Sequence, residues 1–199
     1  MAKILKITEH ERPRLDEAID ISEIAASLKL DLKKYPQKNG FLVHPRDARW
    51  YRERIKTGRN IEADYFSVAR NGEQVLGYVM GCLKSLLPLY VEKGLITCPE
   101  TAKYLERKAG YFFFGEQIGV NPRFAKRGVG RKLLEGMVAW AKAYDADRVI
   151  VDILHEPTRN EASITFCEQF GFKQADEIEN SDHTTWGLYE LDLRNMEKK

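Results

Sequence analysis

The sequence has no apolar run that approaches the ~20 residues of a membrane-spanning helix. Its first fifteen residues lack the apolar core of a secretory signal peptide. The formal net charge is only +2, which gives no electrostatic case for nucleic acid or an anionic membrane as the main partner. We therefore expect a cytoplasmic protein that binds neither nucleic acid nor membranes.

Cysteine and histidine are scarce. The three cysteines, Cys82, Cys98 and Cys167, are odd in number and widely spaced, so they form neither a disulfide framework nor a zinc pattern. The four histidines show no metal-binding spacing such as H-E-x-x-H. We expect no metal site. Low-complexity tracts, linkers and internal repeats are also lacking, and the length suits one domain over residues 1–199.

Apolar periodicity predicts an ordered series of helices and strands. The predicted helices span 15–28, 46–56, 99–108, 129–144 and 160–170, and the predicted strands span 3–8, 64–70, 74–83, 111–120, 147–154, 172–178 and 184–193. Helix 46–56 is rich in charge and typical of a surface helix. Segment 84–98 fits neither pattern. The order predicts a mixed α/β (α+β) domain.

The turn after strand 111–120 is the most informative segment. Gly128 and Gly130 lack a Cβ, so an anionic ligand can approach the backbone where the next helix begins. Lys126, Arg127 and Arg131 add positive charge. The spacing differs from the Walker and G-x-G-x-x-G patterns, which disfavours a nucleotide triphosphatase or a dehydrogenase. The alternative is a glycine-containing helix start beside a solvated basic surface.

Two motifs together resemble the GNAT superfamily of N-acetyltransferases. Residues 118–134, IGVNPRFAKRGVGRKLL, resemble its acetyl-CoA-binding signature, in which a strand ending V-x-P precedes [QR]-x-x-G-x-[GA] and a helix. Residues 160–172, NEASITFCEQFGF, resemble the second signature, N-x-x-A-x-x-x-Y-E-x-x-G-F. The resemblance covers roughly residues 111–193, and earlier residues match only in element order.

The resemblance implies a GNAT-like, mixed, mostly antiparallel central sheet that is flanked by helices and whose central strands, 112–120 and 148–154, splay apart. Acetyl-CoA would be the co-substrate, with its pantetheine arm in the splay and its pyrophosphate on the backbone of 126–131. The Ile118 N–H would hold the thioester carbonyl and then the oxyanion. The implied cofactor-binding residues are Ile118, Gly119, Val120, Lys126, Arg127, Gly128, Val129, Gly130, Arg131 and Asn160.

Two positions depart from the family pattern. Ala125 stands where the family has Gln or Arg, which removes one side-chain ligand from a cradle that is mainly backbone. We expect weaker CoA binding rather than none. Cys167 stands where the family has the tyrosine that protonates the leaving thiolate.

Glu116 is the predicted general base. An amine must lose a proton before it attacks, because a lysine-like amine has a pKa of ~10.4. Glu116 precedes Ile118 by two residues, which in a regular strand places both side chains on one face, and apolar neighbours would raise its pKa. The alternative is a carboxylate paired with a nearby arginine. Asp152 and His155, at the end of the neighbouring central strand, are further candidates for the base.

Cys167 is the second predicted catalytic residue. It lies seven residues, about two helical turns, after Asn160, so the two side chains share a face and Cys167 would point toward the thioester sulfur. It could donate a proton to the thiolate. One alternative is a small buried hydrophobe. Another is a covalent acetyl carrier in a ping-pong scheme.

The expected function is N-acetyl transfer from acetyl-CoA to a primary amine by direct attack in a ternary complex. The acceptor is a small molecule or a protein amine that the sequence does not identify, and a homodimer is left open. Candidates to line an acceptor pocket are Tyr35, Phe41, Tyr51, Tyr90 and Trp186, although core packing is the commoner fate of such residues.

Two alternatives come from the same features. The departures at Ala125 and Cys167 suit a non-catalytic acyl-CoA-binding or sensor protein. Gly115 and Gly119 could leave space for a longer acyl chain near the thioester.

Overall fold

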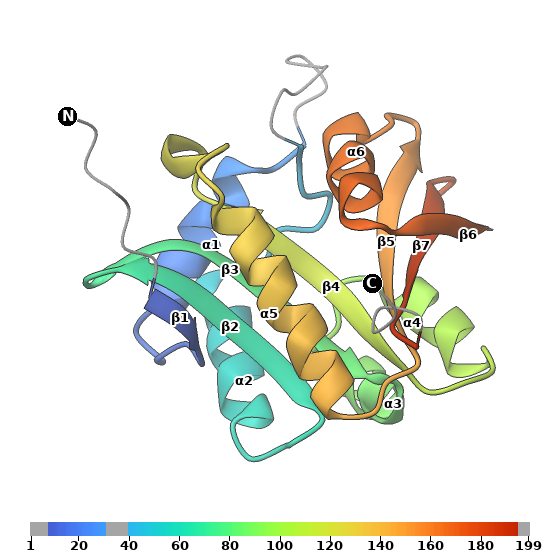
Figure 1. The fold of residues 1–199 in the computed structure, drawn as a ribbon, viewed down its shortest axis with the longest axis horizontal. Coiled ribbons are helices and arrows are strands. Elements are labelled where there is room, and N and C mark those ends of the chain that lie inside the picture. Colours follow the sequence, from blue (N-terminus) through green and yellow to red (C-terminus); the bar gives the residue numbers. More distant parts are fainter. Residues whose placement is uncertain (1–7, 31–39, 195–199) are drawn as a thin grey trace.

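One seven-stranded sheet runs through the molecule (Figure 1). The computed structural model describes residues 8–30 and 40–194. The strand order is β1-β2-β3-β4-β5-β7-β6, and all neighbours are antiparallel except β4 and β5, which are parallel. The strands are β1 (Thr8–Glu11), β2 (Asp64–Asn71), β3 (Gln74–Leu83), β4 (Phe112–Val120), β5 (Arg148–Glu156), β6 (Lys173–Glu179) and β7 (Thr185–Asp192). The predicted mixed, mostly antiparallel sheet is confirmed.

Helices cover both faces of the sheet (Figure 1). α5 and α6 pack on one face, and α1, α2, α3 and α4 pack on the other. The helices are α1 (Ala18–Ser27), α2 (Ala48–Gly58), α3 (Leu87–Glu92), α4 (Pro99–Glu106), α5 (Val129–Ala143) and α6 (Glu161–Phe170), with short 3-10 turns η2 (Lys84–Leu86) and η3 (Pro122–Phe124). No helix in the described ranges is both long and apolar enough to cross a bilayer.

Most predicted elements match the structure, with differences at the start of the chain and in one connection. The predicted strand 3–8 lies outside the described residues except for Thr8, where β1 begins. Segment 84–98, which had no predicted structure, contains η2 and α3. Together with α4 it forms an insertion, residues 84–111, between β3 and β4.

β4 and β5 separate halfway along their length, as the resemblance implied. Their parallel ladder runs from Phe112↔Arg148 to Gly115↔Val151 and ends there. Beyond it, β4 continues to Val120 in its pairing with β3. β5 continues to Glu156 in its pairing with β7. The predicted splay is therefore confirmed, and it places residues 116–120 and 152–156 on two diverging strands.

Candidate active site

A bulge at Glu116 decides which β4 side chains face the α2 side of the sheet. The register shift between Met80 and Gly81 leaves Glu116 without a partner on β3. Glu116 and Gln117 both contact α2 residues as a result, whereas Ile118 packs against the core on the α5 face. The prediction that Glu116 and Ile118 share a face is wrong, because it assumed unbroken alternation along the strand.

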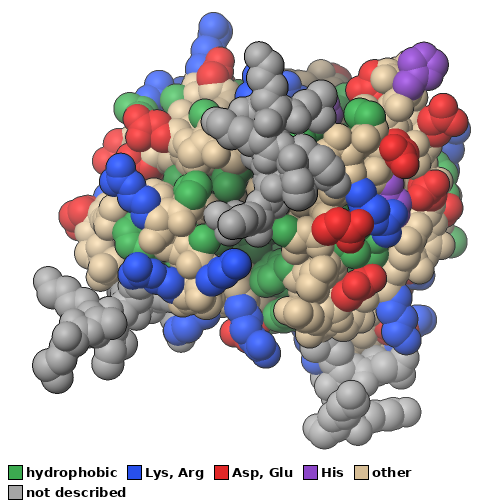
Figure 2. All heavy atoms as spheres, turned by 90° about the horizontal axis from the view of Figure 1, so that it is seen from above, with side chains coloured by type: hydrophobic (Ala, Val, Ile, Leu, Met, Phe, Trp, Pro, Cys, Tyr) green, Lys and Arg blue, Asp and Glu red, His purple; other side chains and the backbone are tan. Residues whose placement is uncertain are grey.

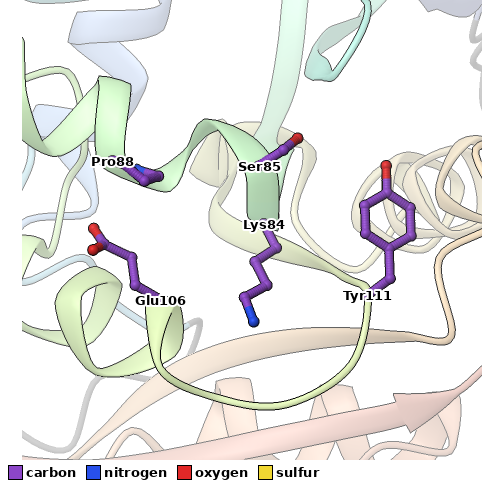
Figure 3. A pocket seen from close by; sticks show the side chains of 5 residues that line it. All are labelled: Lys84, Ser85, Pro88, Glu106 and Tyr111. Atoms are coloured by element: carbon purple, nitrogen blue, oxygen red, sulfur yellow. The ribbon is translucent and has the colours of Figure 1, made fainter.

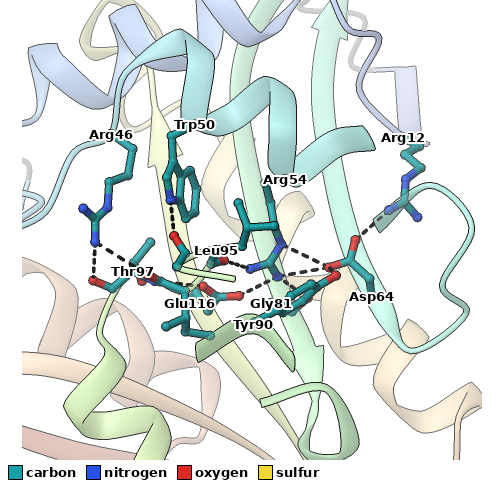
Figure 4. A network of polar contacts seen from close by, with 12 residues as sticks. Arg12, Arg46, Trp50, Arg54, Asp64, Gly81, Tyr90, Leu95, Thr97 and Glu116 are labelled. Carbon is teal, nitrogen blue, oxygen red and sulfur yellow. Dashed lines mark hydrogen bonds and ion pairs between the residues drawn. The ribbon is translucent and has the colours of Figure 1, made fainter. Parts of the chain in front are cut away.

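Arg54 of α2 lies at the centre of a buried ion network (Figure 4). Its side chain is fully buried, and its Nη2 lies 2.6 Å from Glu116 Oε1 and 3.0 Å from Asp64 Oδ1. Arg12 pairs with the other Asp64 oxygen at 2.6 Å, and the Tyr90 hydroxyl donates to Asp64 at 2.7 Å. The prediction of a surface helix is wrong for Arg54, because two carboxylates compensate the charge that would otherwise stay in water.

The same network fixes the loop that leads into α4 (Figure 4). Arg54 donates to the Leu95 carbonyl, and the Thr97 amide donates to Glu116 Oε2 at 3.3 Å. Burial raises the pKa of Glu116, although Arg54 lowers it. Glu116 is therefore found in a pair with an arginine, which is the alternative to a free base.

Asp152 of β5 lies just beyond the last β4–β5 pair, on the α4 side of the sheet. Burial raises the pKa of Asp152 to about 7, although hydrogen bonds from Thr101 and Cys98 lower it. Its Oδ2 is buried and receives no hydrogen bond from the described residues. A carboxyl group with this pKa exchanges protons near neutral pH. The negative charge of Glu116 contributes to the rise, so the two carboxyl groups act on each other.

His155 is directed away from these carboxyl groups. Its Nδ1 lies 2.8 Å from Glu177 Oε2, and its Nε2 lies 3.1 Å from the Tyr189 hydroxyl. The ring crosses Gly187 of β7, where an added Cβ would lie 2.3 Å from Nε2. His155 therefore points toward β7 and β6, on the side of β5 that is remote from β4.

The turn before α5 has the backbone form of an anion-binding nest. Lys126 and Gly128 have left-handed φ values of 60° and 83°, and no side chain caps the helix start. An added Cβ at Gly128 would meet nothing within 4 Å, so this backbone faces open space. At this end of the molecule, Lys and Arg side chains gather beside a hollow lined by apolar side chains (Figure 2).

The amides of Ile118 and Val120 point toward the splay. Asn121 N donates to the Leu76 carbonyl on β3 at 2.9 Å. Successive amides of a strand point to opposite sides, so the N–H groups of Val120 and Ile118 point to the side from which β5 has diverged. This is the orientation that the resemblance required of them.

Asn160 has two structural roles. It is the N-cap of α6, where its Oδ1 accepts from Ser163 N at 3.4 Å. Its Nδ2 donates to the Phe41 carbonyl at 3.0 Å. Asn160 is buried, so its contact with pantetheine stays a prediction.

Cys167 belongs to the apolar core on the α5 face. Its side chain is buried in the same cluster as Ile164 and Phe172. Burial, and secondarily Glu168, raises the pKa of the Cys167 thiol to about 12. This environment matches the small buried hydrophobe considered for this position.

Gln117 is a site residue that the sequence patterns did not reveal. Its Oε1 accepts from the hydroxyls of Tyr51 at 2.8 Å and Tyr78 at 3.0 Å, and its Nε2 donates to the His44 carbonyl at 3.1 Å. Two adjacent polar residues, Glu116 and Gln117, inside an apolar strand were the available signal of a bulge.

The aromatic candidates for an acceptor pocket divide into three groups. Tyr51 and Tyr90 are fully buried core residues. Phe41 and Trp186 pack together on the α4 side of β5, in a cluster with Leu154. Tyr35 lies outside the described residues.

A pocket lies apart from the separation of β4 and β5 (Figure 3). The pocket is next to Glu106, at the C-terminal end of α4. Cys98, which neighbours Asp152, lies at the opposite end of that helix. Its lining residues are Lys84, Ser85, Pro88, Glu106 and Tyr111.

A family model described as the acetyltransferase (GNAT) family matches residues 29–172, more than two thirds of the chain. The chain belongs to this family. The predicted membership and the predicted acetyltransferase activity are confirmed. A search of curated proteins gave no match.

Solved structures of GNAT proteins share the fold at low sequence identity. An N-acetyltransferase from Staphylococcus aureus is 17% identical, with a TM-score of 0.60 over 92% of this chain and 97% of that one. The yncA protein of Salmonella typhimurium, solved with its cofactor acetyl-CoA, is 15% identical with a TM-score of 0.60 over 94% of each chain. The ribosomal-protein-S18-alanine N-acetyltransferase of Escherichia coli is 13% identical, with a TM-score of 0.56 over 94% of this chain and 93% of that one.

Proposed function

We propose that this GNAT protein transfers an acetyl group from acetyl-CoA to a primary amine by direct attack in a ternary complex. The observation that carries the proposal is the position of Asp152 at the start of the splay, with a pKa of about 7. The nest at Gly128 and the amides of Ile118 and Val120 serve the donor. The acceptor approaches from the α4 side, where Asp152 lies.

Asp152 is the proposed base in place of Glu116. It takes a proton from the ammonium group and leaves a nitrogen lone pair that attacks the thioester carbon. The C–N bond forms first and the carbonyl oxygen becomes an oxyanion; the C–S bond then breaks as the carbonyl re-forms, and the second nitrogen proton goes to the released thiolate. Glu116, paired with Arg54 at 2.6 Å, acts as a positioning residue whose charge helps to raise the pKa of Asp152.

The donor side supplies electrostatic stabilisation. The Ile118 N–H is the proposed donor to the oxyanion, since a fixed amide in a site that excludes water stabilises the charge that develops there. Lys126, Arg127 and Arg131 supply positive charge next to the nest for the CoA phosphates. Cys167 fills space in this proposal, because a thiol with a pKa of about 12 is a poor proton donor to another thiolate.

Transfer of a longer acyl chain is disfavoured, because it would need free space beside Gly115 and Gly119. An added Cβ at Gly119 would lie 2.5 Å from the Tyr78 ring. At Gly115 it would lie 3.0 Å from Val151 and 3.2 Å from Met137. Neighbouring side chains therefore fill the places beside both glycines.

The test is thiol release from acetyl-CoA across a panel of primary amines, followed by variants on the best acceptor. Asp152→Asn should lower kcat by about 10²–10⁴-fold and abolish the acidic limb of the pH–rate profile near pH 7. Glu116→Gln should shift that limb to lower pH, because it removes a charge that raises the pKa of Asp152. Unchanged kcat in Asp152→Asn would remove Asp152 as the base. CoA binding without turnover on any amine would favour the sensor alternative.

A further inference from the structure

Two buried oxygen atoms on the acceptor side have no hydrogen-bond donor. Within residues 8–30 and 40–194, neither Asp152 Oδ2 nor Asn180 Oδ1 has a partner. Buried polar atoms in folded proteins are nearly always paired, since a buried group that has lost water needs a replacement for it. Two orphaned acceptors on side chains that both neighbour Cys98 therefore indicate a ligand that supplies donors.

The two side chains meet at the same sulfur atom. Asn180 Nδ2 lies 3.8 Å from Cys98 Sγ, and Cys98 lies close enough to Asp152 to lower its pKa. Thr101 Oγ1 lies 3.0 Å from that sulfur and likewise lowers the pKa of Asp152. Residues from β5, from the start of α4 and from the β6–β7 turn thus converge on one point.

The insertion holds this arrangement in place. Ser181 N donates to Glu100 Oε2 at 2.9 Å, which ties the β6–β7 turn to the first turn of α4. Asn180 N donates to the Thr184 carbonyl at 2.8 Å, which closes the turn itself. Asn180 is 8% exposed and Asp152 is half-buried, so the cluster opens on the Asp152 side.

We propose that Asp152 Oδ2 and Asn180 Oδ1 together bind the ammonium group of the acceptor, and that Asn180 is the specificity-determining residue for N–H donors. The inference rests on the proposed function and names the part of the acceptor that is recognised. A primary ammonium group carries three N–H donors and a positive charge, so it satisfies both oxygens and complements the carboxylate. A quaternary ammonium carries the charge without donors, and an alcohol carries one donor without charge.

A binding experiment tests this without turnover. The CoA-saturated protein, with ¹⁵N-labelled asparagine, is titrated with methylammonium and, separately, with tetramethylammonium. Methylammonium should shift the Asn180 side-chain amide resonance, and tetramethylammonium should not. Asp152→Asn should remove the response, whereas Gln174→Leu, an exposed amide-to-leucine change on β6, should leave it intact.

Kinetics supply the second measurement. Asn180→Leu, or Asn180→Ala if the leucine variant does not fold, should raise the KM for the amine by about tenfold or more, as expected for one lost hydrogen bond to a charged group. The KM for acetyl-CoA should not change. The inference is overturned if both cations shift Asn180 equally, if methylammonium shifts nothing, or if Asn180 variants keep the wild-type KM. Thiol release by the wild-type protein would still support the proposed function in each of these cases.

Discussion

Arg54→Met should destabilise the protein through Glu116. Methionine fills much of the same space but removes the charge that faces two carboxylates. Asp64 keeps Arg12 at 2.6 Å, whereas among the described residues Glu116 keeps only the Thr97 amide at 3.3 Å. Removal of one partner from a buried ion pair costs about 3–5 kcal/mol. We expect about 3 kcal/mol at neutral pH, the lower end of that range, because Asp64 stays paired.

The pH dependence identifies Glu116 as the source of the loss. Without Arg54, burial is opposed only by the Thr97 amide and raises the pKa of Glu116 in the folded state further above its unfolded value. The folded variant then binds a proton more tightly than the unfolded chain does. The destabilisation of the variant should be small below the pKa of Glu116 in the unfolded chain, and it should grow as the pH rises through the pKa of Glu116 in the folded state. Arg54→Met combined with Glu116→Gln should recover much of the loss at neutral pH.

Urea unfolding of the single and double variants, at one acidic and one slightly alkaline pH, measures these changes. A loss of about 3 kcal/mol corresponds to a drop in Tm of roughly 6–12 °C for a chain of this size. Lys56→Met, a matched change at an exposed position of α2, should change stability by less than about 0.5 kcal/mol. The reasoning is refuted if Arg54→Met unfolds at the wild-type urea concentration, or if the double variant is no more stable than the single one.

Three further outcomes are expected. Cys167→Ala should keep kcat near the wild-type value and cost about 1 kcal/mol in urea unfolding; a tenfold drop in kcat would restore an acid role for the thiol. Gly128→Ala should cost about 1–2 kcal/mol, because φ is +83°, and should raise the KM for acetyl-CoA but not for the amine; an unchanged KM for acetyl-CoA would remove the nest from donor binding. Asp152→Asn should be more stable than the wild type above about pH 7. In the wild type the folded-state pKa of Asp152 is raised to about 7, so its protonation stabilises the fold below the unfolded pKa, and this stabilisation is lost as the pH rises through about 7. Melting curves that differ equally at all pH values would contradict this.

The donor side of the site was predictable because its geometry follows from local rules. A glycine ahead of one amphipathic helix and an asparagine at the start of another are local signals in the sequence, and the structure gives Gly128 a positive φ and makes Asn160 the N-cap of α6. The second contact of Asn160 was not predictable. It reaches the Phe41 carbonyl, 119 residues earlier in the chain.

The acceptor side was less predictable because it depends on residues that are distant in the sequence. Arg54 has the charge pattern of a surface position, and its burial depends on Asp64 and Glu116 from two different strands. The bulge at Glu116 interrupts the alternation of side chains along β4. A strict two-residue period therefore assigned Glu116 to the wrong face of the sheet. The contact of Asn180 with Cys98 exists only because the β6–β7 turn lies against the start of α4, which the local sequence does not indicate.

The insertion at residues 84–111 begins and ends at neighbouring positions of strands β3 and β4. Leu83 pairs with Phe113, so the ladder holds the two ends of the segment together. Chain-closure entropy rises by only about 0.6 kcal/mol for each doubling of loop length, so the length of the connection is weakly constrained. Thr97, Cys98 and Thr101 would be exchanged together while β4, β5 and the turn before α5 stay as they are. A graft between Leu83 and Phe112 that keeps the buried residues of α3 and α4, such as Leu87 and Leu105, would therefore alter the acceptor-facing wall and the choice of amine without redesign of the donor site.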